Sequence, residues 1–170
     1  MVNNTSNNNY IGPMTPYFGS DNNKDYNQEL EISVKGIENL NSLQPYEINT
    51  KVGEFMGQIG DIFLKHFQKH KIEKLGDKKT TLEDAKPYIM EHYYNRLRAS
   101  LIMPINNDSE WSLICNRRSN IEAFNRMFGS FVDIINTQEI EKMMKELQSS
   151  FSIDKDDIPA NIPEDFWWYQ

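Results

Sequence analysis

The pattern of hydrophobic and polar positions is strongest between residues 52 and 67. Apolar side chains recur there at helical spacing and share one face, while charged and amide side chains occupy the opposite face. The apolar positions are Val52, Phe55, Met56, Ile59, Ile62, Phe63 and Phe67. This spacing predicts a core-facing helix that begins near residue 46 or 50 and continues to Leu75, just before Gly76.

Three glycines, at positions 53, 57 and 60, line one flank of this predicted helix. Each glycine costs about 1 kcal/mol relative to alanine in a helix interior, so we expect another part of the protein to approach this flank closely. The glycines do not form a phosphate-binding loop, because they lie inside a helical pattern and no Gly-Lys-Ser or Gly-Lys-Thr follows them.

The stretch from Thr80 to Leu101 also has helical periodicity. Thr80 and Glu83 have the spacing of a capping box, which favours a helix start at Thr80. Pro87 would kink or break a helix at this depth, so a short turn followed by a helix from about Lys86 is the alternative.

Two further helices are predicted in the C-terminal half, over residues 119–135 and 137–151. The first would open at a capping box formed by Ser119 and Glu122. Between residues 97 and 116, two apolar runs surround an Asn-Asn-Asp-Ser segment, which predicts either a β-hairpin or a loop between helices. Pro104 argues against a central strand.

The two ends of the chain differ in composition from its middle. Residues 1–28 contain seven Asn within the first 23 positions, and this composition buries too little apolar area to fold alone. We therefore expect an N-terminal arm whose apolar anchors include Tyr17 and Phe18. Residues 153–170 are acidic and finish on four aromatic residues: Phe166, Trp167, Trp168 and Tyr169. These aromatics predict a tail that docks either on the chain's own helices or on a neighbouring subunit.

The middle of the chain, residues 29–152, is expected to form one small, mainly α-helical bundle of about four helices. A short strand at Leu30, Ile32 and Val34 and the β-hairpin near 97–116 are its possible β elements. The sequence has neither an apolar run long enough to span a bilayer nor the pattern of a signal peptide. Cys115 is the only cysteine, which excludes an intramolecular disulfide framework. We expect an intracellular protein, in the cytoplasm or in a virion.

The net charge of −7 is unevenly distributed, with −5 over residues 1–64, +4 over residues 65–126 and −6 over residues 127–170. The candidate basic surface consists of Lys65, Lys69, Lys71, Lys74, Lys78 and Lys79. Such a surface could meet nucleic-acid phosphates or the acidic face of another protein, or it could remain a solvated face.

Few residues suggest catalysis or metal binding. His66 and His70 are four residues apart on one helix side, but the Glu that follows the first His in zinc proteases is missing and lysines surround the pair. Cys115 precedes two arginines that could lower the pKa of its thiol, and His92 could serve as its base. One cysteine and three histidines produce such pairs by chance, so we predict no catalytic, metal or cofactor-binding residues.

These patterns favour a non-enzymatic structural subunit of a larger assembly, which uses its terminal arms to bind other protein subunits in a homo- or hetero-oligomer. By analogy of architecture, a connector, ring or tail component of a bacteriophage virion is the concrete example. The alternative is a nucleic-acid-associated accessory or regulatory protein with an acidic tail. For the assembly subunit, deletion of 1–28 or of 160–170 is expected to abolish partner binding but to leave the helical fold.

Overall fold

The computed structural model describes residues 21–67, 79–129 and 135–170, and these residues form helices and connecting turns without any strand. The α-helices are α2 (Asp21–Lys35), α3 (Pro45–Ile62), α4 (Lys79–Ile89), α5 (Asn95–Ile102), α6 (Asp108–Phe128) and α7 (Gln138–Leu147). Wider π-helical turns follow α3 at Phe63–Phe67 and α4 at Met90–Tyr94. Single 3₁₀ turns lie at Leu40–Ser42, Gln148–Ser150, Lys155–Asp157 and Trp167–Tyr169. The predicted mainly helical fold is confirmed.

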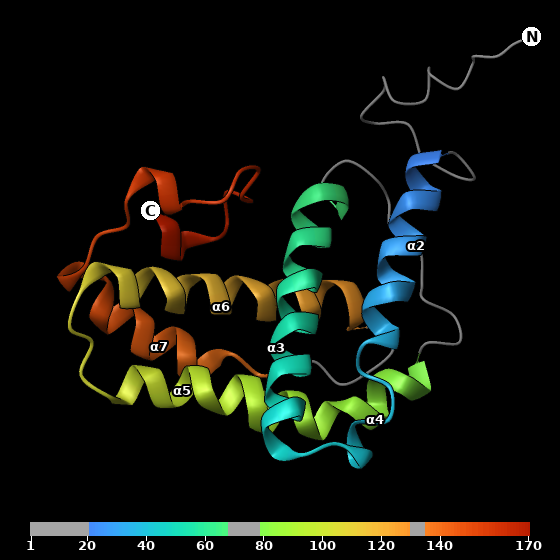
Figure 1. Ribbon diagram of the computed structural model, residues 1–170. Coiled ribbons are helices and arrows are strands. Elements are labelled where there is room, and N and C mark those ends of the chain that lie inside the picture. The colour runs from blue at the N-terminus through green and yellow to red at the C-terminus, as the bar shows by residue number, and fades with distance from the viewer. Residues whose placement is uncertain (1–20, 68–78, 130–134) are drawn as a thin grey trace, which may run out of the picture.

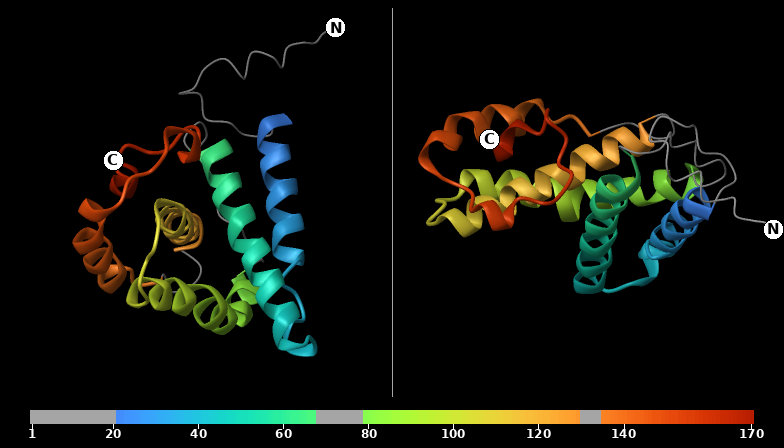
Figure 2. Two further views of the ribbon diagram at one scale, coloured as in Figure 1. Left: turned by 60° about the vertical axis from the view of Figure 1, so that its left-hand side comes forward. Right: turned by 90° about the horizontal axis from the view of Figure 1, so that it is seen from above.

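The helices pack as two groups that cross one another (Figures 1 and 2). Helices α2 and α3 form a side-by-side pair. Helix α4, its π turn and α5 make one continuous rod, and α6 returns along this rod. Helix α3 contacts α2, the rod and α6, so the predicted central helix does occupy the centre of the bundle.

Local signals explain where α3 begins. Gln44 is the N-cap, Pro45 takes the first helical position, and the backbone N–H of Gln44 donates to Glu47 at 2.9 Å. The predicted apolar face is buried from Val52 to Phe63, whereas the side chain of Phe67 lies outside the described part. Phe55 packs against Phe124 and Phe128 of α6. The regular α-helix ends at Ile62, and the predicted end at Leu75 lies outside the described residues.

The glycine flank of α3 meets a close neighbour at only one of its three positions. Gly60 lies against Asn120 of α6, whereas a β-carbon at Gly53 or Gly57 would have no atom within 4 Å. The expectation of close approach along the whole flank is therefore wrong, because α6 crosses α3 and touches the flank at a single turn.

Gly60→Ala should lower the free energy of unfolding by about 1 to 3 kcal/mol through overpacking. The new β-carbon would lie 2.0 Å from Oδ1 and 2.9 Å from Cγ of Asn120, whose Nδ2 donates to the Tyr93 hydroxyl at 2.8 Å. Gly57→Ala is the matched control and should raise stability by up to about 1 kcal/mol. Urea denaturation of both variants compares them, and a stability gain at position 60 would contradict the packing.

The N-terminal part of the domain differs from the prediction. The residues expected to form a short strand, Leu30, Ile32 and Val34, lie in α2. Leu30 and Val34 are buried, together with Tyr26 one turn earlier, while Ile32 is exposed. The four-residue spacing of the buried side chains therefore outweighs the brief alternation. Because α2 begins at Asp21, residues 21–28 are helical and not part of an extended arm.

Helix α4 runs through Pro87, so the helix start near Thr80 is close to the observed one and the alternative start near Lys86 is wrong. The predicted β-hairpin over 97–116 is also wrong, because this region contains the end of α5, a short loop and the start of α6. The alternative of a loop between helices is the observed one.

Helix α6 begins eleven residues before the predicted capping box, because Asn107 is its N-cap and accepts the Glu110 backbone N–H at 2.9 Å. Ser119 lies inside α6, where it is buried. Helix α7 starts close to prediction, with Asn136 accepting the Gln138 backbone N–H at 3.0 Å.

Candidate interaction surface

The aromatic C-terminal tail, which the sequence left with two possible docking sites, folds back over α6 of its own chain (Figures 1 and 2). Phe166, Trp168 and Tyr169 are buried, and Trp167 is half-buried. Three of the four tail aromatics that were predicted to bind a partner are therefore covered by the chain itself. Tyr17 and Phe18 lie outside the described residues.

Trp168 is held by polar and cationic groups of α6. Its indole Nε1 donates to Ser119 Oγ at 2.8 Å, and the Arg118 guanidinium lies 4.4 Å from its ring centre. The Tyr169 hydroxyl lies 3.2 Å from the same Ser119 oxygen. These contacts fix the position of the tail on α6, because the Trp168 indole N–H and the Tyr169 hydroxyl both have hydrogen-bond partners.

Phe166 anchors the tail nearer to α3. Its ring stacks on Phe63 with centroids 6.1 Å apart, and the Arg126 guanidinium lies 5.2 Å from the Phe166 ring centre. Arg126 also pairs with Asp165 of the tail. The acidic tail thus neutralises a cation of α6, as its charge predicts.

Only Lys65 of the predicted basic surface has a described side chain; Lys69, Lys71, Lys74 and Lys78 lie outside the described residues, as does the side chain of Lys79. Lys65 Nζ lies 2.5 Å from Glu29 of α2, and His66 Nε2 lies 3.1 Å from the same carboxylate. Burial raises the pKa of Glu29, but hydrogen bonds and charges of Lys65 and His66 outweigh burial and lower it overall. Lys65 therefore has an acidic partner within the chain.

The side chains considered for chemistry are separated by the fold. His66 faces Glu29, whereas His92 Nδ1 lies 2.7 Å from Asn49. Cys115 is buried with its Sγ 3.4 Å from the Trp168 carbonyl, and burial raises the pKa of its thiol to about 12. The possibility of a lowered thiol pKa is therefore wrong, because burial desolvates the thiolate. Within the described ranges no three His, Cys, Asp or Glu side chains gather as metal ligands, and His70 lies outside them.

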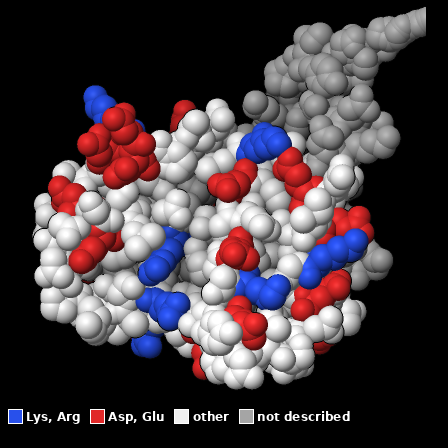
Figure 3. Space-filling view, viewed as in Figure 1, with Lys and Arg blue, Asp and Glu red and all other residues white. Residues whose placement is uncertain are grey.

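Sequence reasoning missed an exposed apolar corner where α5 meets α6. Ile102, Met103 and Leu113 are 65%, 66% and 49% exposed, and they make up three of the five large apolar side chains that the described residues leave exposed. We call this surface the α5–α6 corner. Met103 and Leu113 line a groove of about 390 Å³ together with Ala99, Pro104 and Ile105. In Figure 3 few charged side chains lie at the lower left of the molecule, where the loop between α5 and α6 runs in Figure 1.

Charges of opposite sign flank the apolar part of the α5–α6 corner on α6. Glu110, Leu113 and Arg117 follow one another at helical spacing, so they share one face of the helix. Glu110 accepts the Asn106 backbone N–H at 2.8 Å, and Arg117 lies 3.5 Å from Ser100 Oγ. This face of α6 is therefore acidic at Glu110, apolar at Leu113 and basic at Arg117.

The run of five apolar residues from Leu101 to Ile105 is the signal that could have indicated this surface. A helix end cannot direct all five consecutive side chains to one core, so some of them must be exposed.

No protein family model, curated protein or solved structure matches the chain. None of the helices in the described part of the chain is both long and apolar enough to cross a bilayer.

Proposed function

We propose that this protein is a non-enzymatic structural subunit of an assembly and that it binds a second copy of itself through the α5–α6 corner. The observation that carries the proposal is that Met103 and Leu113, two exposed large apolar side chains, line one groove, with the exposed Ile102 next to Met103 in the sequence. Exposed apolar side chains that gather at one place mark interaction surfaces. The aromatic tail residues contribute less to the binding of another subunit than the sequence suggested, since three of them are buried within the chain.

The charge order along α6 favours a second copy as the occupant. In a two-fold contact, α6 would pack antiparallel to its counterpart with Leu113 near the axis. Glu110 and Arg117 lie on opposite sides of this position, so each would face the opposite charge of the second copy. A surface with an acidic, an apolar and a basic position in this order is therefore complementary to a second copy of itself in the antiparallel arrangement.

Leu113→Asp should raise the dissociation constant of the dimer at least about tenfold, because it places a charge at the centre of an apolar contact. Sedimentation velocity over a range of protein concentrations measures this change. Ile32→Asp is the matched control, since Ile32 is also an exposed large apolar residue, 61% exposed on α2 and away from the corner. A wild-type protein that remains monomeric at every concentration would contradict the proposal.

Charge exchange tests the two-fold geometry. Glu110→Lys and Arg117→Glu should each weaken the dimer, because like charges then face one another, and the double exchange should restore it. The double variant carries both substitutions in α6, so any loss of helix stability that they cause would persist in it. Restored dimerisation would therefore show that the single variants act through the contact between the two copies. Weakening in the single variants without restoration in the double variant would count against an antiparallel contact.

The finer expectation of a bacteriophage virion component, and the alternative of a nucleic-acid-associated protein, stay predictions. Lys65, the member of the basic surface with a described side chain, is paired with Glu29. We therefore rank self-assembly through the α5–α6 corner first.

A further inference from the structure

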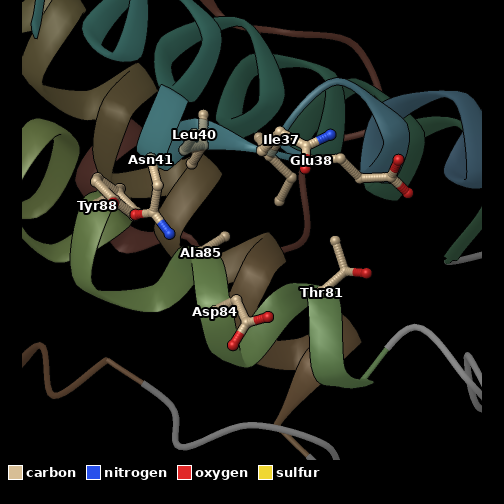
Figure 4. A pocket seen from close by; sticks show the side chains of 9 residues that line it. Ile37, Glu38, Leu40, Asn41, Thr81, Asp84, Ala85 and Tyr88 are labelled. Carbon is tan, nitrogen blue, oxygen red and sulfur yellow. The ribbon is translucent and has the colours of Figure 1, made fainter. Parts of the chain in front are cut away.

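A small cavity lies between the turn that follows α2 and helix α4 (Figure 4). These elements lie on the opposite side of the bundle from the tail (Figure 1). Its volume is about 240 Å³. Ile37, Leu40 and Ala85 line it, and all three are buried, so they form an apolar floor. Asn39 adopts the left-handed conformation with φ of 59°, and this reversal brings the turn over α4.

Polar side chains surround this floor. Asn41 and Glu38 come from the turn, whereas Thr81 and Asp84 come from α4 on the other side (Figure 4). Within the described part of the chain, the side chains of Glu38, Asn41 and Asp84 make no hydrogen bond or ion pair, so their polar groups are available to a ligand. The Tyr88 ring closes one end of the cavity.

The size of the cavity limits what can bind. Sites for nucleotides and other ligands of drug size take about 300 to 1,000 Å³, so the cavity is too small for them. It has the dimensions of one long side chain or of a similarly small molecule.

The charge and chemistry of the lining select among such groups. Its ionisable carboxylates are Glu38 and Asp84, and no Lys or Arg of the described residues lines the cavity. In Figure 4 the carboxylates stand at the rim and not over the floor, so the apolar part of a ligand would cover the floor while its charged end reaches the rim. The Tyr88 ring offers a further surface to a cation.

We propose that this cavity binds a guanidinium or primary ammonium group on an apolar stem, the chemistry of an arginine or lysine side chain. The apolar floor holds the stem, and the two rim carboxylates, Glu38 on the turn and Asp84 on α4, are the candidate acceptors for the cation. The site is separate from the α5–α6 corner, so it does not depend on self-association.

Titration of the full chain with N-acetyl-arginine methylamide, followed by amide NMR chemical shifts, tests the proposal. The shifts should change over residues 37–41 and 81–88 with a millimolar dissociation constant, as expected for a ligand of this size. The citrulline analogue has the same shape without the charge and should bind at least about tenfold more weakly at low salt. Equal binding of both probes, or an absence of shifts in these residues, would overturn the proposal.

Glu38→Gln with Asp84→Asn should weaken binding of the arginine probe about tenfold at low salt. Glu54→Gln with Asp61→Asn is the matched control on α3, because it removes the same charge from exposed positions outside the cavity. Unchanged binding in the first variant, or equal weakening in both variants, would reject the site.

Agmatine, a free guanidinium compound, distinguishes the source of the ligand. Binding of agmatine as tight as that of the capped arginine supports a free cation as the ligand, whereas tighter binding of the capped arginine supports the side chain of a polypeptide. Both results support the assigned chemistry.

Discussion

Replacing Trp168 with alanine should lower the free energy of unfolding by about 3 to 5 kcal/mol, the usual cost of deleting a large buried aromatic side chain. Trp168 is 2% exposed and its ring centre lies 4.7 Å from that of Phe166. The variant would also remove the donor to Ser119 Oγ and uncover one face of the Arg118 guanidinium. The aromatic tail therefore belongs to the folding core, although it is the last part of the chain.

Trp167→Ala is the matched control, because it removes the same side chain from the adjacent position. Trp167 is half-buried and its ring lies 5.3 Å from the Lys145 ammonium, so we expect the smaller loss. Chemical denaturation followed by circular dichroism compares the two variants. Equal losses would show that the tail is not seated as described. A Trp168→Ala protein as stable as the wild type would restore the earlier expectation that residues 160–170 can be deleted without loss of the helical fold.

Helix α3 could be predicted because its determinants are local. Gln44 as the N-cap and Pro45 at the first helical position set its start. Its apolar side chains keep the same helical spacing over about four turns. Helix α7 follows the same rule, with Asn136 capping a short amphipathic segment. In both helices the neighbouring residues alone determine where the helix begins and which face is buried.

Helices α2 and α6 were mispredicted where tertiary contacts override residue type. Leu30, Ile32 and Val34 alternate like a strand, yet packing on α3 selects the four-residue spacing instead. Arg118 is of a residue type that predicts solvent exposure, and Ser119 has the spacing of a capping box, which predicts a helix start. Both are buried inside α6 because the tail covers them, and the tail is about fifty residues distant in sequence.

The predicted contact with another subunit stays a prediction, and the exposed apolar side chains lie elsewhere than the sequence suggested. Aromatic residues at the terminus suggested a contact with another subunit, and the fold uses these residues within the chain. The apolar run at 101–105 carries the exposed side chains instead, because α5 ends there and the chain turns into α6. Sequence period alone does not distinguish an apolar residue that faces the core from one just beyond the helix end.

Removal of both carboxylate partners of Arg118, by Glu122→Gln with Glu141→Gln, should lower the free energy of unfolding by about 3 to 5 kcal/mol. Arg118 is 1% exposed; its Nη1 donates to Glu122 at 2.9 Å and its Nη2 to Glu141 at 2.7 Å. Its Nε has no hydrogen-bond partner, and the remaining contact of Nη2, to Thr137 Oγ1 at 3.4 Å, supplies no negative charge. Each single variant should lose less than half of this amount, because one carboxylate still compensates the buried charge.

Addition of Arg118→Met to the double variant provides the decisive comparison. Methionine removes the buried charge and keeps much of the side-chain volume, so the triple variant should regain part of the lost stability. Glu139→Gln is the control for an exposed ion pair, since its partner Arg98 is solvated and the change should alter stability little. Urea denaturation at neutral pH compares the free energies of unfolding of the wild type, the double variant, the triple variant and the Glu139→Gln control. A triple variant less stable than the double one would show that Arg118 stabilises the fold mainly through its stacking on Trp168 and not through its ion pairs.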